Sequence, residues 1–450
     1  MNIVQITPGA GGMYCGNCFR DNALVAELRR EGHQTTLVPL YLPMTVEDAD
    51  QSVGTPIFFG GVSVYLEQKI PWFAKAPAWL HNWLSSPAIL KWAAGRAAKT
   101  RAEDVGDLTV SMLRGELGQQ ARELRVFIDW LKTQPKPDVV CLSNALLVGM
   151  ARQIRRELSV PVVITLQGED AFLDAMRSPH REIAWKTLSE RCAEVDLFIA
   201  PSRYFGDLMA RRLGLAADRV SVVYNGVNQT GYDTPGAAAP PDTPALGFFA
   251  RMCREKGLDT LVEAFILLKQ RPATQNLRLK VGGSCGPSDE PLVRELKERL
   301  HANGCLGDAE FCTNVDRAAK IAFLKSLTVL SVPALYGEAF GLYVIEALAA
   351  GVPVVQPRHA SFPELIEATG GGTICEPGDA RALADAIAGL LADPEKLRAL
   401  GAAGRQAARE RFTIRELALN SVRAFAQAGR NFATTTSDGA KGPTVAGIHA

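Results

Sequence analysis

The stretch "EAFGLYVIEALAAGVPVV" at residues 338–355 places a glycine turn, a short apolar helix and the start of a β-branched strand in direct succession. This succession is typical of α/β folds with parallel strands. Glu346 stands inside the apolar helix, eight positions after Glu338 in the turn. Burying an isolated carboxylate is unfavourable, so Glu346 requires a partner that compensates its charge.

On both sides of this stretch, short β-branched runs alternate with longer amphipathic segments, which indicates parallel strands joined by helical crossovers. A helix is predicted at residues 19–33, after a glycine-rich turn. Strands are predicted at residues 2–7, 35–41, 138–143, 161–167, 196–202 and 219–225, and in a second series at 245–251, 277–283, 309–313, 327–333 and 353–357. We therefore expect two Rossmann-like halves.

A segment rich in proline, glycine, alanine and threonine separates the two series, as is typical of a linker between domains. The predicted parts are an N-terminal Rossmann-like domain at 1–228 with a helical insertion at about 66–130, a linker at 229–244, a C-terminal Rossmann-like domain at 245–413, a helix at 414–429 and a mobile tail at 430–450.

The composition indicates an ordinary globular protein. Among 450 residues, 47% are hydrophobic and 22% are charged, which argues against global disorder. The 49 basic residues nearly balance the 48 acidic ones, so we expect no nucleic-acid partner. We find no secretory signal and no uninterrupted apolar span of membrane length, and we expect a cytoplasmic protein. Nine scattered cysteines predict no disulfide framework.

Two features stay open at this stage. The spacing of Cys15 and Cys18 fits a redox pair or half of a zinc site, although we favour two unreactive thiols in a glycine-rich loop. Residues 66–100 carry four tryptophans among lysines and arginines. They fit a core-packed helical insertion, a lid over an acceptor, or a peripheral contact with the inner membrane face.

Three glycine-bearing turns follow predicted strands and precede predicted helices, at residues 9–12, 282–283 and 340–341. Amides at a helix start have no intrahelical acceptor and carry partial positive charge, so they suit phosphate oxygens. No G-x-G-x-x-G or P-loop pattern accompanies them, which argues against dinucleotide-dependent dehydrogenases and P-loop enzymes.

The stretch "FFARMCREKGLDTLVEAF" (248–265) carries two cations where a strand ends. Arg251 and Lys256 suggest a clamp for a diphosphate, with arginine as a fork and lysine as a point charge. The alternative is a solvated basic turn that also contains Arg254 and Glu255.

These two stretches, together with "VSVVYNGVN" (220–228), resemble the family-4 retaining glycosyltransferases. The resemblance covers most of the chain and is strongest from 195 to 380. It implies the GT-B fold, in which two Rossmann-like domains face each other across a cleft. It further implies a nucleotide-diphosphate sugar as donor, a carbohydrate or lipid-linked acceptor, and transfer with retention of the anomeric configuration. Helix amides and two cations can stabilise the leaving diphosphate, so no metal and no cofactor are expected.

The resemblance also implies roles for particular residues. Glu346 would accept hydrogen bonds from the ribose hydroxyls, which would answer the question of its partner. Glu338 would hold the transferred sugar and stabilise positive charge near its anomeric carbon. Arg251 and Lys256 would neutralise the leaving group. The remaining donor-binding positions are the backbone amides of Phe340, Gly341 and Leu342, the base-reading loop near Asn314 and Val315, and Gly11 and Gly12 of the first domain.

One position departs from the family pattern. Gln167 stands where such enzymes often have a histidine near the transferred sugar, and glutamine can donate a hydrogen bond but cannot titrate. Glu169 and Asp170 follow and would contact sugar hydroxyls or acceptor, although solvated loop carboxylates are the interpretation we favour. His359 is expected to be structural, and Glu364 to line the donor pocket.

Three functions are therefore compared. The first is a metal-independent retaining glycosyltransferase. The second is a nucleotide-sugar-binding protein with weakened catalysis, which Gln167 favours. The third is a GT-B-fold sugar-nucleotide epimerase, against which the spacing of Glu338 and Glu346 argues.

Overall fold

The computed structural model describes residues 1–9, 16–44, 46, 48–59, 105–232 and 243–440. The described chain forms two compact units. Unit 1 comprises Met1–Pro201, Gly206–Val223 and Ala418–Ala450, and unit 2 comprises Ser202–Phe205 and Tyr224–Leu417. Gly11, Gly12, Cys15 and the tryptophan-rich segment 66–100 lie outside the described residues, so the predictions for them stay predictions.

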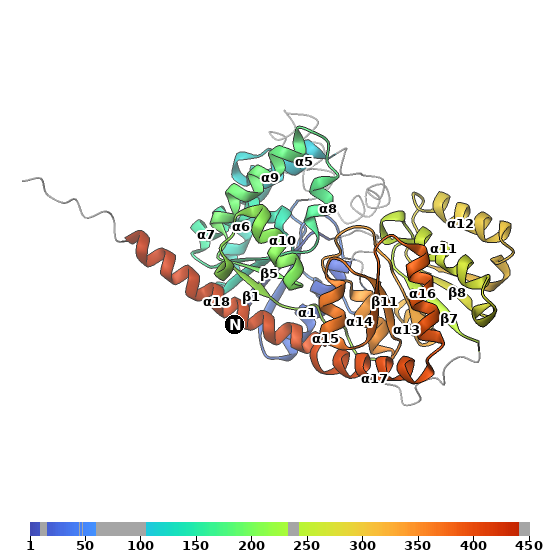
Figure 1. The fold of residues 1–450 in the computed structure, drawn as a ribbon. Helices are drawn as coiled ribbons and strands as arrows, with labels where there is room; N and C mark the ends of the chain where they lie inside the picture. The colour runs from blue at the N-terminus through green and yellow to red at the C-terminus, as the bar shows by residue number, and fades with distance from the viewer. Residues whose placement is uncertain (10–15, 45, 47, 60–104, 233–242, 441–450) are drawn as a thin grey trace, which may run out of the picture. The chain divides into compact units, whose positions relative to one another are not determined.

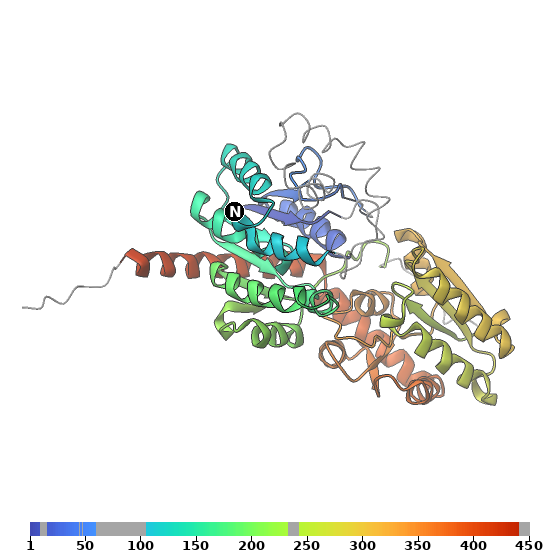
Figure 2. The same ribbon diagram turned by 90° about the horizontal axis from the view of Figure 1, so that it is seen from above.

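Unit 1 is built on a six-stranded parallel sheet in the order β2-β1-β3-β4-β5-β6. Its strands are β1 (Asn2–Thr7), β2 (Gln34–Pro39), β3 (Val139–Leu142), β4 (Val162–Thr165), β5 (Leu197–Ala200) and β6 (Val220–Val222). The central strands are buried along their length because helices cover both faces of the sheet (Figures 1 and 2).

The helical segments associated with this sheet are α1 (Gly16–Arg30), α5 (Gly106–Arg114), η3 (Gly115–Leu117), α6 (Ala121–Thr133), η4 (Ala145–Met150), α7 (Ala151–Leu158), α8 (Glu169–Asp174), α9 (His180–Arg191), η5 (Cys192–Glu194), α10 (Arg203–Leu213) and η6 (Ala217–Arg219). The final helix α18 (Ile414–Ala440) supplies its residues from 418 onward to unit 1. There the Asn431 side chain donates to the Asp196 carbonyl at 3.0 Å, and Arg155 lies over the ring of Phe432.

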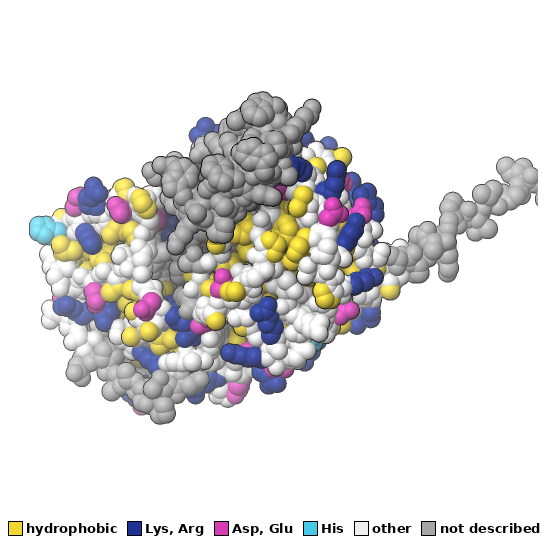
Figure 3. Space-filling view, turned by 180° about the vertical axis from the view of Figure 1, so that it is seen from behind, with side chains coloured by type: hydrophobic (Ala, Val, Ile, Leu, Met, Phe, Trp, Pro, Cys, Tyr) yellow, Lys and Arg dark blue, Asp and Glu magenta, His cyan; other side chains and the backbone are white. Residues whose placement is uncertain are grey.

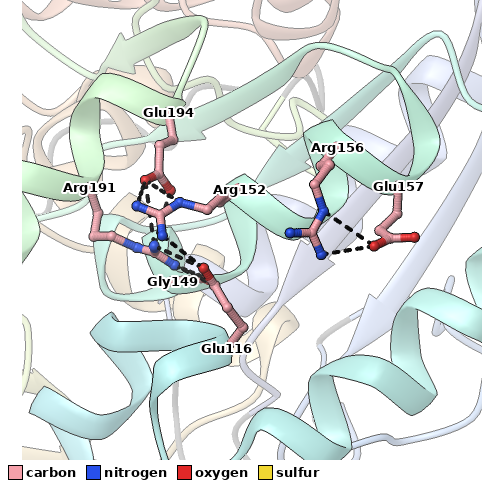
Figure 4. Close-up of polar contacts among 7 residues, drawn as sticks. All are labelled: Glu116, Gly149, Arg152, Arg156, Glu157, Arg191 and Glu194. Carbon is pink, nitrogen blue, oxygen red and sulfur yellow. Dashed lines mark hydrogen bonds and ion pairs between the residues drawn. The ribbon is translucent and has the colours of Figure 1, made fainter.

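A network of ion pairs and hydrogen bonds joins five of these segments (Figure 4). The nearly buried Arg191 guanidinium donates to the Gly149 carbonyl at 2.9 Å and to the Glu116 carboxylate at 2.8 Å. Arg152 donates to the same Glu116 at 3.0 Å and also pairs with Glu194. The network therefore fixes η3, η4, α7 and the junction of α9 with η5 to one another.

Unit 2 is built on a second six-stranded parallel sheet, in the order β12-β11-β10-β7-β8-β9. Its strands are β7 (Ala245–Phe249), β8 (Arg278–Gly283), β9 (Ala309–Thr313), β10 (Val329–Leu330), β11 (Val354–Pro357) and β12 (Gly372–Cys375). Its helical segments are η7 (Arg254–Lys256), α11 (Leu258–Lys269), η8 (Pro272–Thr274), α12 (Glu290–Ala302), η9 (Leu306–Asp308), α13 (Arg317–Lys325), α14 (Leu342–Ala349), α15 (Phe362–Thr369), α16 (Ala380–Leu391) and α17 (Pro394–Arg411). One apolar core connects this sheet with the helices around it.

Each sheet has a point where the strand order reverses. In unit 1 the reversal lies between β1 and β3, and in unit 2 between β7 and β10. In open parallel α/β sheets, ligands bind outside the carboxyl ends of the strands at such a point. The loops after β7 and β10 are therefore where a ligand of unit 2 is expected.

The predicted fold of two Rossmann-like units is confirmed, and all eleven predicted strands differ from the observed ones by at most three residues at either end. Strand β10 is the shortest of them, because it is only Val329–Leu330 whereas 327–333 was predicted. Strand β12 was missed, and α1 begins and ends three residues earlier than predicted. The closing helix, predicted at 414–429, is longer than expected, because α18 continues to Ala440 and so includes the first part of the predicted tail.

The domain boundary lies close to the predicted position, between Val223 and Tyr224 rather than after residue 228. Helices α5 and α6 occupy the described part of the predicted insertion. On the face drawn in Figure 3, basic and acidic side chains are interspersed and do not form one large field of a single sign.

Candidate active site

The loops after β7 and β10 bring together Lys256 and Glu338, which lie 82 positions apart in the sequence. The Lys256 ammonium lies 2.5 Å from Glu338 Oε2. Tyr336 and Tyr343 donate to the same oxygen at 3.1 and 2.9 Å. Oε1 of Glu338 has no hydrogen-bond partner among the described residues, and the side chain keeps 13% exposure. The carboxylate is thus held by one oxygen and can receive a ligand with the other.

The two tyrosines also enclose the lysine. The Lys256 ammonium lies 4.9 Å from the ring centroid of Tyr336 and 5.2 Å from that of Tyr343, within the range of cation–π attraction. Burial, and then the charge of Glu338, hold the pKa of Tyr343 well above its ordinary value. Tyr343 therefore remains a neutral hydrogen-bond donor at physiological pH.

Arg251 lies in the same loop as Lys256 but pairs with a different carboxylate. Its guanidinium donates to Asp289 Oδ1 at 2.9 Å through Nη2, and Nε lies 3.1 Å from Oδ2. This pairing raises the pKa of Arg251, and 56% of the side chain remains exposed. Arg251 and Lys256 thus each pair with a carboxylate of their own, and the clamp on one diphosphate stays a prediction.

Glu346 has a partner that the sequence analysis did not identify. The Lys320 ammonium, on α13, donates to Glu346 Oε1 at 2.9 Å. Lys320 is nearly buried, and the Glu346 side chain is 17% exposed. The charge of Glu346 is thus compensated within unit 2, and Glu346 Oε2 remains available to a second partner.

The turn before α14 has the geometry of an anion site. Gly341 adopts φ +88° directly before the helix, a conformation that L side chains rarely adopt. Phe340 is buried against Tyr224 and Phe412, which fixes the turn from below. Among the described residues, no acceptor receives the amides of Phe340, Gly341 and Leu342. Amides in this position can bind phosphate oxygens.

The loop after β9 is fixed to the loop after β8 by Asn314. Its backbone has φ +54°, its amide donates to the Gly283 carbonyl, and its side chain makes two hydrogen bonds with Cys285. The side chain of Asn314 thus shapes the loop, which leaves the backbone near Val315 for the predicted contact with a base.

In unit 1, Gln167 is held by two side chains of α1. The O and N atoms of its side-chain amide are assigned from these neighbours: with Oε1 facing Arg20 and Nε2 facing Asn17, Oε1 accepts from Arg20 and Nε2 donates to Asn17 at 3.1 Å. Arg20 is itself buried beside Asp21. Since Nε2 carries two hydrogens, one donor of Gln167 remains for a ligand. Asn17 and Arg20 were missed because nothing in their local sequence distinguishes them from helix surface residues.

The interpretation of Glu169 and Asp170 as solvated carboxylates is wrong. Glu169 is 4% exposed and accepts from the amides of Ala145 and Gln167 at 2.7 and 2.8 Å. Burial raises its pKa against the effect of these amides. Asp170 is 8% exposed, and burial raises its pKa as well. Glu169 therefore ties the loop after β4 to η4, and both of its oxygens are engaged.

Two further positions serve the packing of unit 2. Glu364 is 8% exposed and accepts from the amides of Arg203 and Tyr204 and from the Tyr224 hydroxyl. Burial and this bond raise the pKa of Tyr224 to about 12. His359 Nε2 lies 3.0 Å from the Tyr336 carbonyl, which fits the structural role predicted for it.

Among the described residues, no group of three or more His, Cys, Asp or Glu side chains has the arrangement of a metal site. Within the same part of the chain, no helix combines the length and apolarity that a membrane span requires.

Solved structures show which class of protein has this fold. Sucrose-phosphate synthase from Thermosynechococcus elongatus superposes with a TM-score of 0.70 at 19% identity, over 95% of this chain and 98% of that one. Anabaena HepE in complex with UDP-glucose superposes with a TM-score of 0.61 at 17% identity, over 97% of this chain and all of that one. The fold is that of the GT-B glycosyltransferases, as the sequence predicted.

Sequence comparison gives the family. The profile of the glycosyl transferases group 1 matches residues 235–407, and that of glycosyltransferase family 4 matches residues 96–230. The chain belongs to the glycosyltransferases of the family-4 type.

Curated relatives match over part of their length. D-inositol 3-phosphate glycosyltransferase of Xylanimonas cellulosilytica is 32% identical over 250 residues, which are 52% of this chain and 58% of that protein. Glycogen synthase of Mycobacterium tuberculosis is 26% identical over 305 residues, or 66% of this chain and 70% of that protein. The chain thus spans little more than half of the first of these relatives.

Proposed function

We propose that the protein is a retaining glycosyltransferase that moves a sugar from a nucleotide-diphosphate sugar to a hydroxyl of a carbohydrate or lipid-linked acceptor. The observation that carries the proposal is the Lys256–Glu338 pair between Tyr336 and Tyr343, at the carboxyl ends of β7 and β10. The UDP-glucose bound to HepE supports a donor of this class, and the name of D-inositol 3-phosphate glycosyltransferase supports glycosyl transfer.

In the proposed reaction, the bond between the anomeric carbon and the diphosphate oxygen breaks, and a bond from that carbon to the acceptor oxygen forms. The acceptor proton passes to the leaving diphosphate on the same face of the sugar. The amides of Phe340, Gly341 and Leu342 bind the diphosphate, and Lys256 neutralises part of its charge. We propose that these groups suffice without a metal ion.

Glu338 stabilises the positive charge that develops at the anomeric carbon as the bond breaks. Its Oε1 faces no protein partner among the described residues, whereas its Oε2 is fixed by Lys256 and two tyrosines. Because the carboxylate is held in place before the donor binds, it needs no reorganisation in the transition state.

Binding of the nucleoside is assigned to Glu346 and to the loop after β9. Glu346 Oε2 accepts from a ribose hydroxyl while Oε1 stays paired with Lys320. The base contacts backbone groups near Asn314 and Val315. Arg251, which is half exposed, reaches the diphosphate only if it leaves Asp289 or shares it.

The second candidate is a nucleotide-sugar-binding protein with weakened catalysis. The observation that favours it is Gln167, whose amide is engaged by Arg20 and Asn17 and cannot exchange a proton. Both candidates bind the donor, and only the first turns it over.

A thermal-shift panel of UDP, GDP and ADP sugars identifies the donor, because a ligand that binds the native state raises its stability. Transfer to added acceptors, or slow hydrolysis of the donor, is then measured for the wild type and for Lys256→Gln. The proposal expects turnover by the wild type and a large loss in the variant. Donor binding with no turnover by the wild type in any acceptor screen would favour the binding protein, and no binding of any sugar nucleotide would exclude both.

A further inference from the structure

Unit 2 contains a cavity at the opposite ends of the strands from the proposed active site. It measures ≈ 560 Å³ and lies between α17, the end of α13 and the loops that precede β10 and β11. These loops are at the amino ends of the strands, whereas Glu338 and Gly341 follow the carboxyl ends. Because the strands of this sheet are parallel, all their amino ends lie on one side of it and all their carboxyl ends on the other. The two sites therefore lie at opposite ends of the strands.

The cavity is strongly basic. Four cations line it against a single carboxylate, and the residues are Lys325, Arg398, Arg405, Arg409 and Glu410. Neither Arg398 nor Arg405 pairs with a carboxylate in the part of the chain that the structure describes. Glu410 accepts from Gln406 at 3.0 Å. The local charge is thus positive in a chain whose net charge is only +1.

Arg405 is one of the cations that line the cavity, and its guanidinium has an N–H group that donates to no acceptor among the described residues. Its Nη2 donates to the Tyr232 carbonyl at 3.1 Å, and that neutral oxygen does not cancel the charge. Its Nε is buried and has no acceptor among the described residues. A buried donor without an acceptor is unfavourable, and an anion in the cavity would remove this penalty.

The spacing along α17 directs the cations to one place. Arg398, Arg405 and Arg409 stand at i, i+7 and i+11 and therefore share a face of the helix. Gly401 and Ala402 between them leave room above the helix, and a Cβ at Gly401 would come within 2.5 Å of the Gly351 carbonyl. The closely packed backbones at Gly401 and Gly351 thus form the floor of the cavity. The arginines around this floor repel one another.

We propose that this cavity binds a small phosphate ester, at a site separate from the one that binds the donor. Arginine presents paired N–H groups that match phosphate oxygens, and three of them on one helix face can surround such a group. The volume is that of a site for a molecule larger than inorganic phosphate. Leu327, Val352 and Leu397 offer apolar contact to the remainder of the ligand.

Calorimetric titration of the full chain with pyrophosphate, a hexose phosphate and a nucleoside monophosphate tests the proposal. The double variant Arg398→Gln/Arg405→Gln is expected to lose at least tenfold in affinity for the ester that binds. Arg294→Gln, which removes an exposed arginine of α12, is the matched control and should bind as the wild type does. Ala402→Glu adds a carboxylate to the cavity and should abolish binding without removing an arginine.

Lys256→Gln separates the two sites. Binding that survives in Lys256→Gln and is lost in the double variant supports the proposal, and the ester that binds more tightly shows whether the ligand is a sugar phosphate or a nucleotide. Binding that is lost in Lys256→Gln and kept in the double variant overturns it, because the phosphate then occupies the active site only. Binding of pyrophosphate with neither ester overturns the assignment to a phosphate ester. Circular dichroism spectra equal to that of the wild type establish that the variants fold.

Discussion

At the scale of single residues, the charge of Glu346 is the most informative feature. The sequence raised the question of its partner, and the structure gives Lys320, which stands 26 positions earlier on α13. A nearly buried lysine beside a part-buried carboxylate stabilises the fold only while both are present. The pair also positions Oε2, so in the proposed function Lys320 would link stability to nucleoside binding.

Replacing Glu346 tests this link. We expect Glu346→Gln to weaken nucleotide binding by about 1.5–3 kcal/mol, since a hydrogen bond to a charged acceptor is lost. The wild type should bind the deoxyribose form of the nucleotide more weakly than the ribose form, whereas the variant should bind the two forms equally well. Titration calorimetry with both nucleotides measures the coupling between the carboxylate and the sugar. An equal loss for both nucleotides would mean that Glu346 acts through Lys320 and not through the ribose.

Glu338 carries the corresponding prediction for turnover. Glu338→Gln keeps the shape of the side chain but removes the negative charge that faces the anomeric carbon. We expect kcat to fall by about 100-fold or more, with a smaller change in KM, because the interaction is stronger in the transition state. Initial rates of donor consumption measure it.

The matched control for Glu338→Gln is Glu376→Gln, an exposed glutamate that pairs with Arg358 in the same unit. Its kcat should equal that of the wild type. Unchanged turnover in Glu338→Gln would remove this residue from the proposed mechanism.

At the scale of elements, strand and helix succession was predictable, and side-chain partnership across elements was not. Alternating β-branched and amphipathic runs gave eleven of the twelve strands. β12 was missed because "GTIC" begins with the last of three consecutive glycines and is only half-buried, so it lacks the apolar run that marked the others. The pairs Lys320–Glu346 and Arg251–Asp289 join residues that are 26 and 38 positions apart. No local sequence pattern predicts pairs at such separations.

The ion network around Arg191 predicts how the free energy of unfolding depends on pH (Figure 4). Burial alone would raise the pKa of Glu116, but the hydrogen bond and charge of Arg191, with that of Arg152, lower it below its ordinary value. A carboxyl whose folded-state pKa is depressed adds stability at every pH above its unfolded-state pKa, and that stability is lost as the pH falls through the folded-state pKa.

Glu116→Gln should therefore lower the free energy of unfolding at pH 7 by about 1–3 kcal/mol, and the difference from the wild type should shrink as the pH falls below about 4. Urea unfolding at several pH values measures it. Glu157→Gln changes a neighbouring exposed pair with Arg156 and should have little effect. A difference that stays constant with pH would assign the loss to packing and not to charge.

At the scale of the whole molecule, the two units have separate sheets, and the apolar core of unit 2 contains no residue of unit 1, so we expect unit 2 to respond to a ligand by itself. The described residues that we propose to bind the nucleotide lie in unit 2. They are the turn at Gly341, Glu346 and the loop at Asn314. A nucleotide without its sugar should therefore stabilise unit 2 directly. At 100 times its Kd, a ligand adds about 2.7 kcal/mol to the free energy of unfolding.

For a unit of this size, that gain corresponds to an increase in Tm of about 5–10 °C. Scanning calorimetry of the full chain should show a transition that shifts by this amount with nucleotide, and the shift should be smaller in Glu346→Gln. The variant Glu116→Gln changes unit 1. It should keep the full shift with nucleotide, while the Tm of unit 1 itself decreases. If Glu116→Gln lost the shift and Glu346→Gln kept it, nucleotide binding would have to be reassigned from unit 2 to unit 1.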